Sequence, residues 1–411
     1  MTQAGIMKTE TPLIYKKLSN VSFESPVKMH VGYHFRELSL YPPDGYKFLT
    51  SQGLKESLLA RLSKYSWSFP VYEKLSDIIP LVLYLAYLQK WTKKKPAEAD
   101  LIYSAGLIFR PEPWVIEIDS LTNLIGMRHV RFFQKYKGLI EREFALNYCK
   151  GIFFHSDFAR NIALSNLNSS EFVHKMITLP RAVHKKNANK IQHEGIKLLF
   201  VGSANASGEF ELRGGKEVLE AFTILVEKHK DIQLVIRSDV PNRLKSKYRN
   251  ILQHPNVRLI EHILPWEELE AVYQSADIFL FPGYYDCWLI MVEAMSYGLP
   301  IVATDVLSVR GELVEDGKNG LIIQRAKDVP YFKGDFPCAH LRDAEWLNAI
   351  YRSTASDVVE DLVDKTSKLI ENEQLRHKMG QAGRWEVEQG RFSIERRNKV
   401  LKEVFDKAIG R

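Results

Sequence analysis

The sequence predicts an α/β protein made of two doubly wound parallel-sheet domains that face each other across a cleft. Its 411 residues are about twice what one hydrophobic core usually organises, and 45% hydrophobic with 26% charged residues is typical of a globular chain. Short apolar runs alternate with helix-like stretches, as in a parallel sheet that helices cover on both faces. The pattern stops at a polar, basic stretch (185–194) and then restarts, which indicates a linker between two domains.

The elements of the first half follow from apolar runs bounded by turn residues. In chain order we expect a polar leader (1–25), a strand (27–35), a turn (42–45), helices (50–64 and 72–91), strands (101–104 and 114–118), a long helix (130–148) and strands (151–155 and 177–179).

The second half repeats the alternation of strands and helices. We expect a strand (197–202), a helix (215–228), strands (233–237 and 257–260), a helix (266–274), a strand (278–282), a helix starting near 293–297, a strand (300–304), an insertion loop (326–345) and C-terminal helices (356–411). Phe392 and Ser393 should cap the last helix. The predicted domain limits are 1–190, 191–390 and 391–411.

Several classes of protein are excluded by what the sequence lacks. Cys149, Cys287 and Cys338 have no paired spacing for zinc or a redox dithiol, and they suit a reducing compartment. We see no export signal and no apolar run near the ~18–20 residues of a membrane span, so we expect a cytoplasmic protein. The sequence contains no G-x-G-x-x-G after the first strand, no G-x-x-x-x-G-K-[ST], no Asp-x-Asp and no histidine pair with zinc spacing, so no metal site is predicted.

The net charge of +7 is divided unevenly, with +11 in residues 1–190 and −4 in residues 191–411. A basic half favours a membrane surface, a nucleic acid or a phosphorylated substrate as its partner. Residues 80–95 combine apolar and aromatic side chains with four lysines, so this segment is predicted to rest on an anionic membrane. The alternative is a core helix that ends in a solvated lysine cluster.

An anion-binding site is predicted beyond the strand at 197–202. The loop after this strand leads to Arg213-Gly-Gly-Lys216 at the start of a helix. Backbone N–H groups, the helix dipole and two cations there favour a phosphate. The alternative is a surface turn that carries two solvated cations.

A pair of carboxylates is the second candidate site. Asp286 follows the strand at 278–282, and Glu293 is expected near the first turn of the next helix. Both could accept hydrogen bonds from a polyhydroxylated ligand. The alternative for Glu293 is that it only complements the helix dipole.

Three motifs in this order resemble the retaining glycosyltransferases of family 4. Residues 293–304, Glu-Ala-Met-Ser-Tyr-Gly-Leu-Pro-Ile-Val-Ala-Thr, match the family string E-A-M-a-x-G-x-P-V-V-a-t. Residues 197–222 are similar to the family's nucleotide-sugar strand, phosphate loop and helix. Residues 311–321 resemble its x-E-x-V-x-D-G-x-N-G-L element.

The resemblance is strong over 195–325, moderate over 370–411 and weak over 1–190. It implies the GT-B fold, with a Rossmann-like acceptor-binding domain first and a Rossmann-like nucleotide-sugar-binding domain second. It also implies a last helix that returns to the N-terminal domain.

The resemblance further implies roles for individual residues. Arg213 stands where the family has a lysine that binds the donor diphosphate, and Lys216 should assist it. Glu293 is similar to the glutamate that holds the ribose hydroxyls, and Asp286 stands near the first acid of the family's E-x7-E pair. Asp119 or Glu117 would orient the sugar from the first domain. The other implied donor contacts are Gly202, Ile263, Leu264, Cys287, Trp288 and Leu289.

The chain departs from the family pattern at three places. Asp286 and Glu293 are seven residues apart where the family has eight, so strict counting places Tyr285 at the first acid. Ser203 occupies a position that is often arginine. The family's histidine after a strand of the first domain is missing from the stretch that runs over residues 114–119.

These features predict a metal-independent and cofactor-free enzyme that moves a sugar from a UDP or GDP sugar to an acceptor hydroxyl, with retention. The expected acceptor is a lipid-linked or surface-polysaccharide precursor, with no nucleic acid partner, at the cytoplasmic face of a membrane. Two alternatives stay open. One is a non-catalytic subunit or scaffold that binds nucleotide sugars, and the other is a sugar phosphorylase or epimerase with the same fold.

Overall fold

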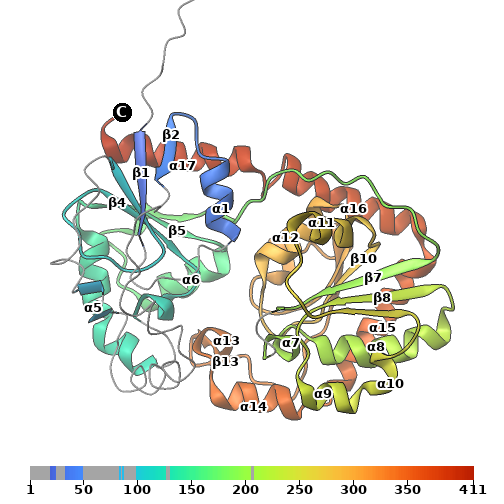
Figure 1. Ribbon diagram of the computed structural model, residues 1–411. Coiled ribbons are helices and arrows are strands. Elements are labelled where there is room, and N and C mark those ends of the chain that lie inside the picture. The colour runs from blue at the N-terminus through green and yellow to red at the C-terminus, as the bar shows by residue number, and fades with distance from the viewer. Residues whose placement is uncertain are drawn as a thin grey trace, which may run out of the picture.

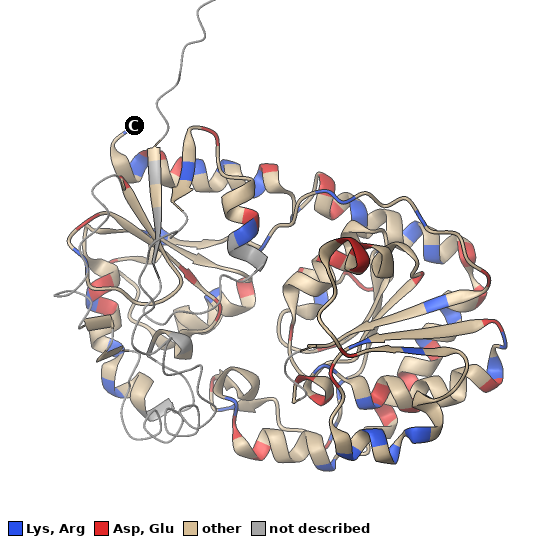
Figure 2. Ribbon diagram, viewed as in Figure 1, with Lys and Arg blue, Asp and Glu red and all other residues tan. Residues whose placement is uncertain are grey.

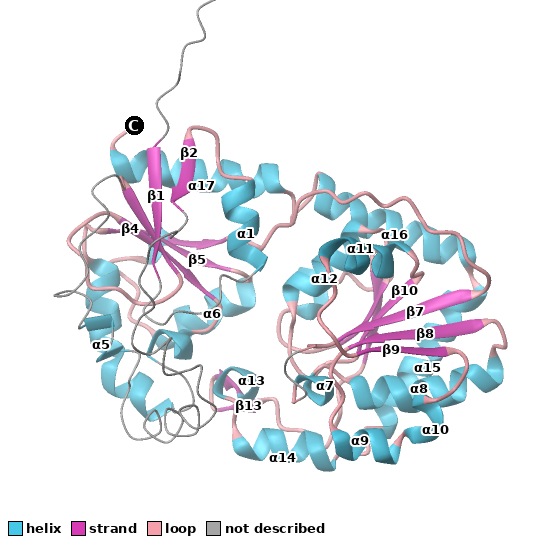
Figure 3. Cartoon of the chain, in the orientation of Figure 1, coloured by secondary structure: helices cyan, strands magenta, loops and turns pink. Residues whose placement is uncertain are grey.

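The computed structural model describes residues 19–24, 33–49, 83–84, 86–87, 99–125, 130–204 and 208–411. In this part of the chain, two parallel six-stranded sheets form separate α/β domains (Figure 1). Figure 3 shows helices on both faces of each sheet, which confirms the predicted doubly wound class. Figure 2 shows the charged residues mainly on helices and loops, whereas most of each strand is uncharged, as expected for strands covered on both faces.

The first sheet has the strand order β2-β1-β3-β4-β5-β6, and all neighbours are parallel. Its strands are β1 (Ser19–Glu24), β2 (Tyr46–Leu49), β3 (Leu101–Ser104), β4 (Trp114–Ile118), β5 (Cys149–Phe154) and β6 (Met176–Thr178). Its helices are α1 (Tyr33–Leu40), α5 (Val130–Ala145), α6 (Asp157–Asn166) and the 3-10 turns η1 (Leu121–Ile125) and η2 (Val173–Lys175).

The N-terminal elements differ from the prediction. β1 lies inside the expected polar leader, because its backbone pairs between β2 and β3 although its sequence is mostly polar. Residues 33–35 begin α1 and are not a strand. The rest of the predicted strand at 27–35, the helix at 50–64 and most of the helix at 72–91 lie outside the described residues.

The second sheet has the order β12-β11-β10-β7-β8-β9 and is also parallel. Its strands are β7 (Ile196–Val201), β8 (Ile232–Arg237), β9 (Val257–Ile260), β10 (Ile278–Phe281), β11 (Ile301–Thr304) and β12 (Gly320–Ile323). Its helices are α7 (Glu209–Leu212), α8 (Gly215–Lys228), α9 (Asn242–Lys247), α10 (Arg249–Leu252), α11 (Trp266–Gln274), α12 (Trp288–Ser296) and the π-type turn η3 (Val309–Leu313).

Three long helices end the chain, and the last one crosses back to the first domain. They are α15 (Ser356–Glu371), α16 (Glu373–Glu388) and α17 (Ile394–Ile409). The Ser393 side chain caps α17 as predicted. Leu401 and Phe405 of α17 are fully buried in one cluster with Tyr103 and other residues of the first sheet. This confirms the predicted return of the C-terminal helix.

The segment 326–345, which we call the arm, is more ordered than the predicted insertion loop. It contains a two-stranded hairpin, β13 (Phe332–Lys333) with β14 (Phe336–Pro337), and a short helix, α13 (Cys338–Leu341); α14 (Ala344–Arg352) begins at its end. In Figure 1 the arm lies between the domains, on the side opposite the 185–194 linker. Phe336 and Leu341 are 3% and 2% exposed and belong to the core of the first domain. Sequence alone missed this because the burial partners are about 200 residues away.

No helix among the described residues is long and apolar enough to span a membrane. Most of the predicted membrane segment 80–95 lies outside the described residues. Its described part is amphipathic, with Leu83 and Ala86 buried and Tyr84 and Tyr87 exposed.

Candidate active site

The carboxyl ends of β7 and β10 are the topological switch point of the second sheet. From the central strand β7 the chain proceeds to β8 and β9 on one side and to β10, β11 and β12 on the other. Ligands of open parallel sheets bind at such a point, because the loops diverge there. The loops after β7 and β10 carry Gly202 and Asp286, as the sequence motifs predicted.

Arg213 lies at this switch point and is held by both loops. Its Nη1 donates to the Gly202 carbonyl at 2.8 Å, and its Nε donates to the Tyr285 hydroxyl at 3.1 Å. Burial acts to lower the pKa of Arg213, but Cys287, Tyr285 and Glu209 raise it above its ordinary value. A charged guanidinium is therefore fixed at the place where a phosphate was predicted.

Gly214 explains why α8 starts directly after Arg213. Its φ of 81° is left-handed, and a Cβ there would lie 2.2 Å from the Pro282 carbonyl oxygen. Only glycine fits this close approach between the two loops.

Lys216 is directed elsewhere. Its ammonium donates to the carbonyls of Ser353 at 2.6 Å and Ile350 at 3.3 Å, and lies 3.4 Å from Glu217. The side chain is almost fully buried, so these partners compensate the loss of water. The contacts contradict the prediction that Lys216 assists Arg213 at a diphosphate, because carbonyls at the end of α14 hold it.

Tyr285 and Asp286 are the two residues that the motif offered for the position of its first acid, and they make different contacts. The Tyr285 hydroxyl donates to Glu209 Oε2 at 2.6 Å and accepts from Arg213, so it belongs to the arginine's environment. Asp286 Oδ2 accepts from the Ser308 hydroxyl and from Trp288 Nε1. Of the two residues only Asp286 is a carboxylate, and Ser308 fixes it in place.

Glu293 lies in the second turn of α12, not near the first turn as predicted, because the helix already begins at Trp288. The residue is 6% exposed. It acts electrostatically on Lys186 of the linker, whose pKa burial lowers and Glu293 raises. The Lys186 ammonium lies 4.0 Å from the centre of the Trp266 ring. Because a helix dipole acts mainly in the first turn, the dipole alternative for Glu293 loses its basis.

The other predicted donor residues fall into two groups. Ile263 is 67% exposed at the loop after β9, with Leu264 buried behind it. Trp288 is buried, donates to Ser308 at 2.8 Å and packs on Phe392 with ring centres 5.7 Å apart. Its side chain therefore packs inside the protein and does not face a ligand, and Leu289 also packs partly against the core.

The first domain contributes a cluster of charged residues at the carboxyl ends of β4, β5 and β6. Buried Glu117 accepts from the Tyr103 hydroxyl at 2.7 Å, and His155 Nε2 lies 2.9 Å from it. Arg181 Nη2 lies 3.5 Å from Glu117 and 3.8 Å from Asp119. Of the two predicted acids, Glu117 is internal, whereas Asp119 is 56% exposed.

Sequence reasoning missed His155 and Arg181. Each of them lies within three residues after the carboxyl end of a parallel strand. This position in the sequence could have marked both residues as candidates for the site. The part of the Asp119 side chain that is covered by the protein acts to raise its pKa, but Arg181, His155 and His340 lower the pKa on balance. Asp119 is therefore a carboxylate that retains its charge.

The clusters of the two domains face each other. Burial raises the pKa of Cys287, while Arg213 of its own domain and Arg181 of the first domain both act to lower it. Cys287 thus lies within the field of an arginine from each domain. Among the described residues, no group of three or more His, Cys, Asp or Glu side chains is arranged to hold a metal ion.

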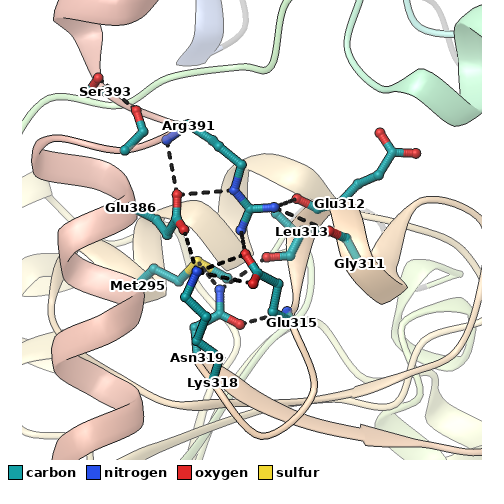
Figure 4. Close-up of polar contacts among 11 residues, drawn as sticks. Met295, Gly311, Glu312, Leu313, Glu315, Lys318, Asn319, Glu386, Arg391 and Ser393 are labelled. Atoms are coloured by element: carbon teal, nitrogen blue, oxygen red, sulfur yellow. Dashed lines mark hydrogen bonds and ion pairs between the residues drawn. The ribbon is translucent and has the colours of Figure 1, made fainter.

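Glu312, from the third predicted motif, joins the domains. Its carboxylate accepts from the backbone N–H groups of Asp157 at 2.6 Å and Phe158 at 2.8 Å, at the start of α6. Arg391 holds the backbone of this turn through the Glu312 carbonyl at 2.9 Å and also contacts Glu386 at 3.0 Å. Figure 4 shows the Glu312 carboxylate turned away from this network. Glu312 therefore links the second domain to the start of α6 in the first domain.

Comparisons with known proteins agree with this arrangement. Residues 185–332 match the family model described as Glycosyl transferases group 1. Over 187 residues the chain is 26% identical to the capsular polysaccharide biosynthesis glycosyltransferase CapM of Staphylococcus aureus. The matched residues are 44% of this chain and 40% of CapM. Over 150 residues it is 30% identical to a GDP-mannose-dependent alpha-mannosyltransferase of Corynebacterium glutamicum, 36% of this chain and 33% of that protein. The matches thus span less than half of these curated relatives.

A solved structure matches over nearly the whole chain. The Anabaena protein HepE, in complex with UDP, superposes with a TM-score of 0.59 and 12% identity, covering 95% of this chain and 100% of HepE. At this identity the likeness shows the fold. The match to the group 1 glycosyltransferase model thus covers residues 185–332, less than half of the chain, and the two facing parallel-sheet domains have the GT-B fold.

Proposed function

We propose that the protein transfers a sugar from a UDP or GDP sugar to an acceptor hydroxyl, with retained anomeric configuration and without a metal ion. The observation that carries this proposal is the position of Arg213, a charged side chain held by Gly202 and Tyr285 at the switch point of the second sheet. A preorganised donor aimed at developing negative charge commonly contributes about 3–4 kcal/mol to the transition state.

In the proposed step, the bond between the anomeric carbon and the diphosphate breaks while the acceptor oxygen attacks from the same face. The acceptor proton passes to the leaving diphosphate, and Arg213 stabilises the negative charge that remains there. Asp119, an exposed carboxylate of the first domain, steadies the positive charge at the anomeric carbon. Asp286 accepts hydrogen bonds from the transferred sugar, and Glu293 accepts them from the ribose.

The nucleotide and the acceptor are proposed from the relatives. HepE was solved with UDP, and the Corynebacterium relative is named for GDP-mannose, so these two nucleotides are the first to test. CapM is named for capsular polysaccharide biosynthesis, which supports a polysaccharide or lipid-linked acceptor and not a nucleic acid.

A membrane-bound acceptor would bring the basic first domain to an anionic surface on the cytoplasmic side. We expect sedimentation with anionic liposomes at low salt, reduced when Lys93, Lys94 and Lys95 become glutamine. Failure to bind at low salt would favour a soluble acceptor.

The deciding experiment is donor turnover. The protein is incubated with UDP, GDP and ADP sugars, and slow release of the nucleotide is followed with and without EDTA. Arg213→Ala should lower turnover more than donor binding, because the charge develops mainly in the transition state. Binding without any turnover would instead favour the scaffold alternative, which the shortened spacing between Asp286 and Glu293 motivates. With an acceptor in hand, NMR of the new linkage checks retention.

A further inference from the structure

The arm of the second domain is anchored in the first domain. The Phe336 ring meets Phe133 of α5 edge on, with ring centres 5.2 Å apart. Thr122 of η1 donates from its hydroxyl to the His340 carbonyl at 3.3 Å, and Leu341 is buried in the same core. The end of α13 is therefore fixed by the first domain.

Arg342 follows directly after this anchor and extends toward the surroundings of Arg213. Its Nη2 lies 2.9 Å from Glu209 Oε1, and its guanidinium carbon lies 5.6 Å from the centre of the Tyr285 ring. The other oxygen of Glu209 accepts from the Tyr285 hydroxyl at 2.6 Å. That hydroxyl in turn accepts from Arg213 Nε at 3.1 Å. The contacts thus run without a gap from Arg342 to Arg213.

Glu209 is the shared member of this chain of contacts. In the part of the chain that the structure describes, its ion-pair partners are Arg342 at 2.9 Å and Arg213 at 3.8 Å. While Arg342 binds Glu209, the Glu209 carboxylate is satisfied and Arg213 bonds to neutral groups, the Tyr285 hydroxyl and the Gly202 carbonyl. Without Arg342, the half-buried Glu209 carboxylate would attract Arg213 directly, because an unpaired charge in a partly desolvated site is costly.

We propose that Arg342 is a positioning residue for Arg213. By holding Glu209 from an arm anchored in the first domain, it keeps Arg213 available for the diphosphate and makes this arrangement depend on contact between the domains. The inference rests on the proposed function, since it takes Arg213 as the diphosphate ligand.

The first variant is Arg342→Asn. Arg342 has φ 48° and ψ 43°, and asparagine tolerates this left-handed conformation, so the variant removes the charge without adding backbone strain. We expect kcat/KM for the donor to fall about tenfold, within the range of couplings between neighbouring charged groups. Arg342→Lys keeps a cation for Glu209 and should retain most of the activity. Lys327→Asn is the matched control, because Lys327 is a 77% exposed charged residue of the same arm, and this variant should leave the rate unchanged.

Two double variants separate positioning from a merely structural role. Arg342→Asn with Glu209→Gln should recover to within about threefold of the parent rate, because the carboxylate that captures Arg213 is gone. In an Arg213→Ala background, Arg342→Asn should have no further effect, because both changes act on the same group. Melting curves of all variants check that they are folded.

The inference is overturned if Arg342→Asn keeps the parent rate, if Glu209→Gln does not restore it, or if the loss is just as large without Arg213. A normal rate in Arg213→Ala alone would instead overturn the proposed function. The two failures are therefore distinguishable in the same set of variants.

Discussion

Replacing Phe336 by alanine should weaken the attachment of the arm to the first domain. The ring is 3% exposed in the core of the first domain, and removing a buried Phe usually costs about 3–5 kcal/mol. The edge-on contact with Phe133 at 5.2 Å adds to the loss, since such pairs contribute about 0.5–1.5 kcal/mol beyond burial. Phe332 of the same hairpin is the matched control: it is 44% exposed and its ring lies 6.2 Å from Phe158. We expect Phe332→Ala to cost less than about 1 kcal/mol, because most of its surface stays in water.

The assay is urea and thermal unfolding of both variants, together with proteolysis of the arm. For a domain of this size, about 2–4 °C is lost per kcal/mol, so a loss of about 3–5 kcal/mol in Phe336→Ala should lower the first unfolding transition by roughly 6–20 °C. Cleavage within residues 326–345 should become faster at temperatures below that transition. If Phe336→Ala unfolds and is cleaved like Phe332→Ala, the arm is not anchored by this ring, and the reasoning from its burial is refuted.

Three further predictions concern the charged residues. Lys216→Met should destabilise the protein by about 3 kcal/mol, because it removes an ion-pair partner of buried Glu217. Nucleotide affinity, measured by calorimetry, should stay unchanged. A loss of affinity at constant stability would instead indicate that Lys216 binds the donor. Glu293→Gln should weaken nucleotide binding about tenfold with an unchanged melting temperature, since charge-assisted hydrogen bonds to the ribose are lost; equal affinity would leave the residue a purely structural role. Burial acts to raise the pKa of Glu386, but hydrogen bonds from Arg391 lower it below its ordinary 4.5. The contribution of the ionised Glu386 to the free energy of unfolding is therefore present above about pH 4.5 and is lost as the pH falls through the lower folded pKa. The urea midpoints of the parent and Glu386→Gln should therefore differ at neutral pH and converge as the pH falls through the lowered folded pKa, and a constant difference would contradict the assignment.

The sequence by itself determined the architecture of the second domain. Helices at 215–228 and 266–274 have the predicted bounds, because buried parallel strands and amphipathic helices follow from local apolar patterns. The same patterns placed Gly202 and Asp286 in the loops after two strands and Arg213 at the start of the helix that follows the first loop, and parallel strands bring their carboxyl ends to one edge. Residues whose position in the site follows from the alignment of parallel strand ends could therefore be predicted from the sequence.

Only the tertiary structure decided which side chains face the site and which face the core. Lys216 is three residues from Arg213 in sequence, yet it turns to the carbonyls of Ile350 and Ser353, which no local pattern could reveal. The polar strand β1 forms because its backbone pairs with two neighbours far along the chain. Arg342 reaches Glu209 across 133 positions because the arm is anchored in the first domain. Local periodicity fixes how a segment folds, whereas burial of charge and contacts between distant segments depend on the assembled chain.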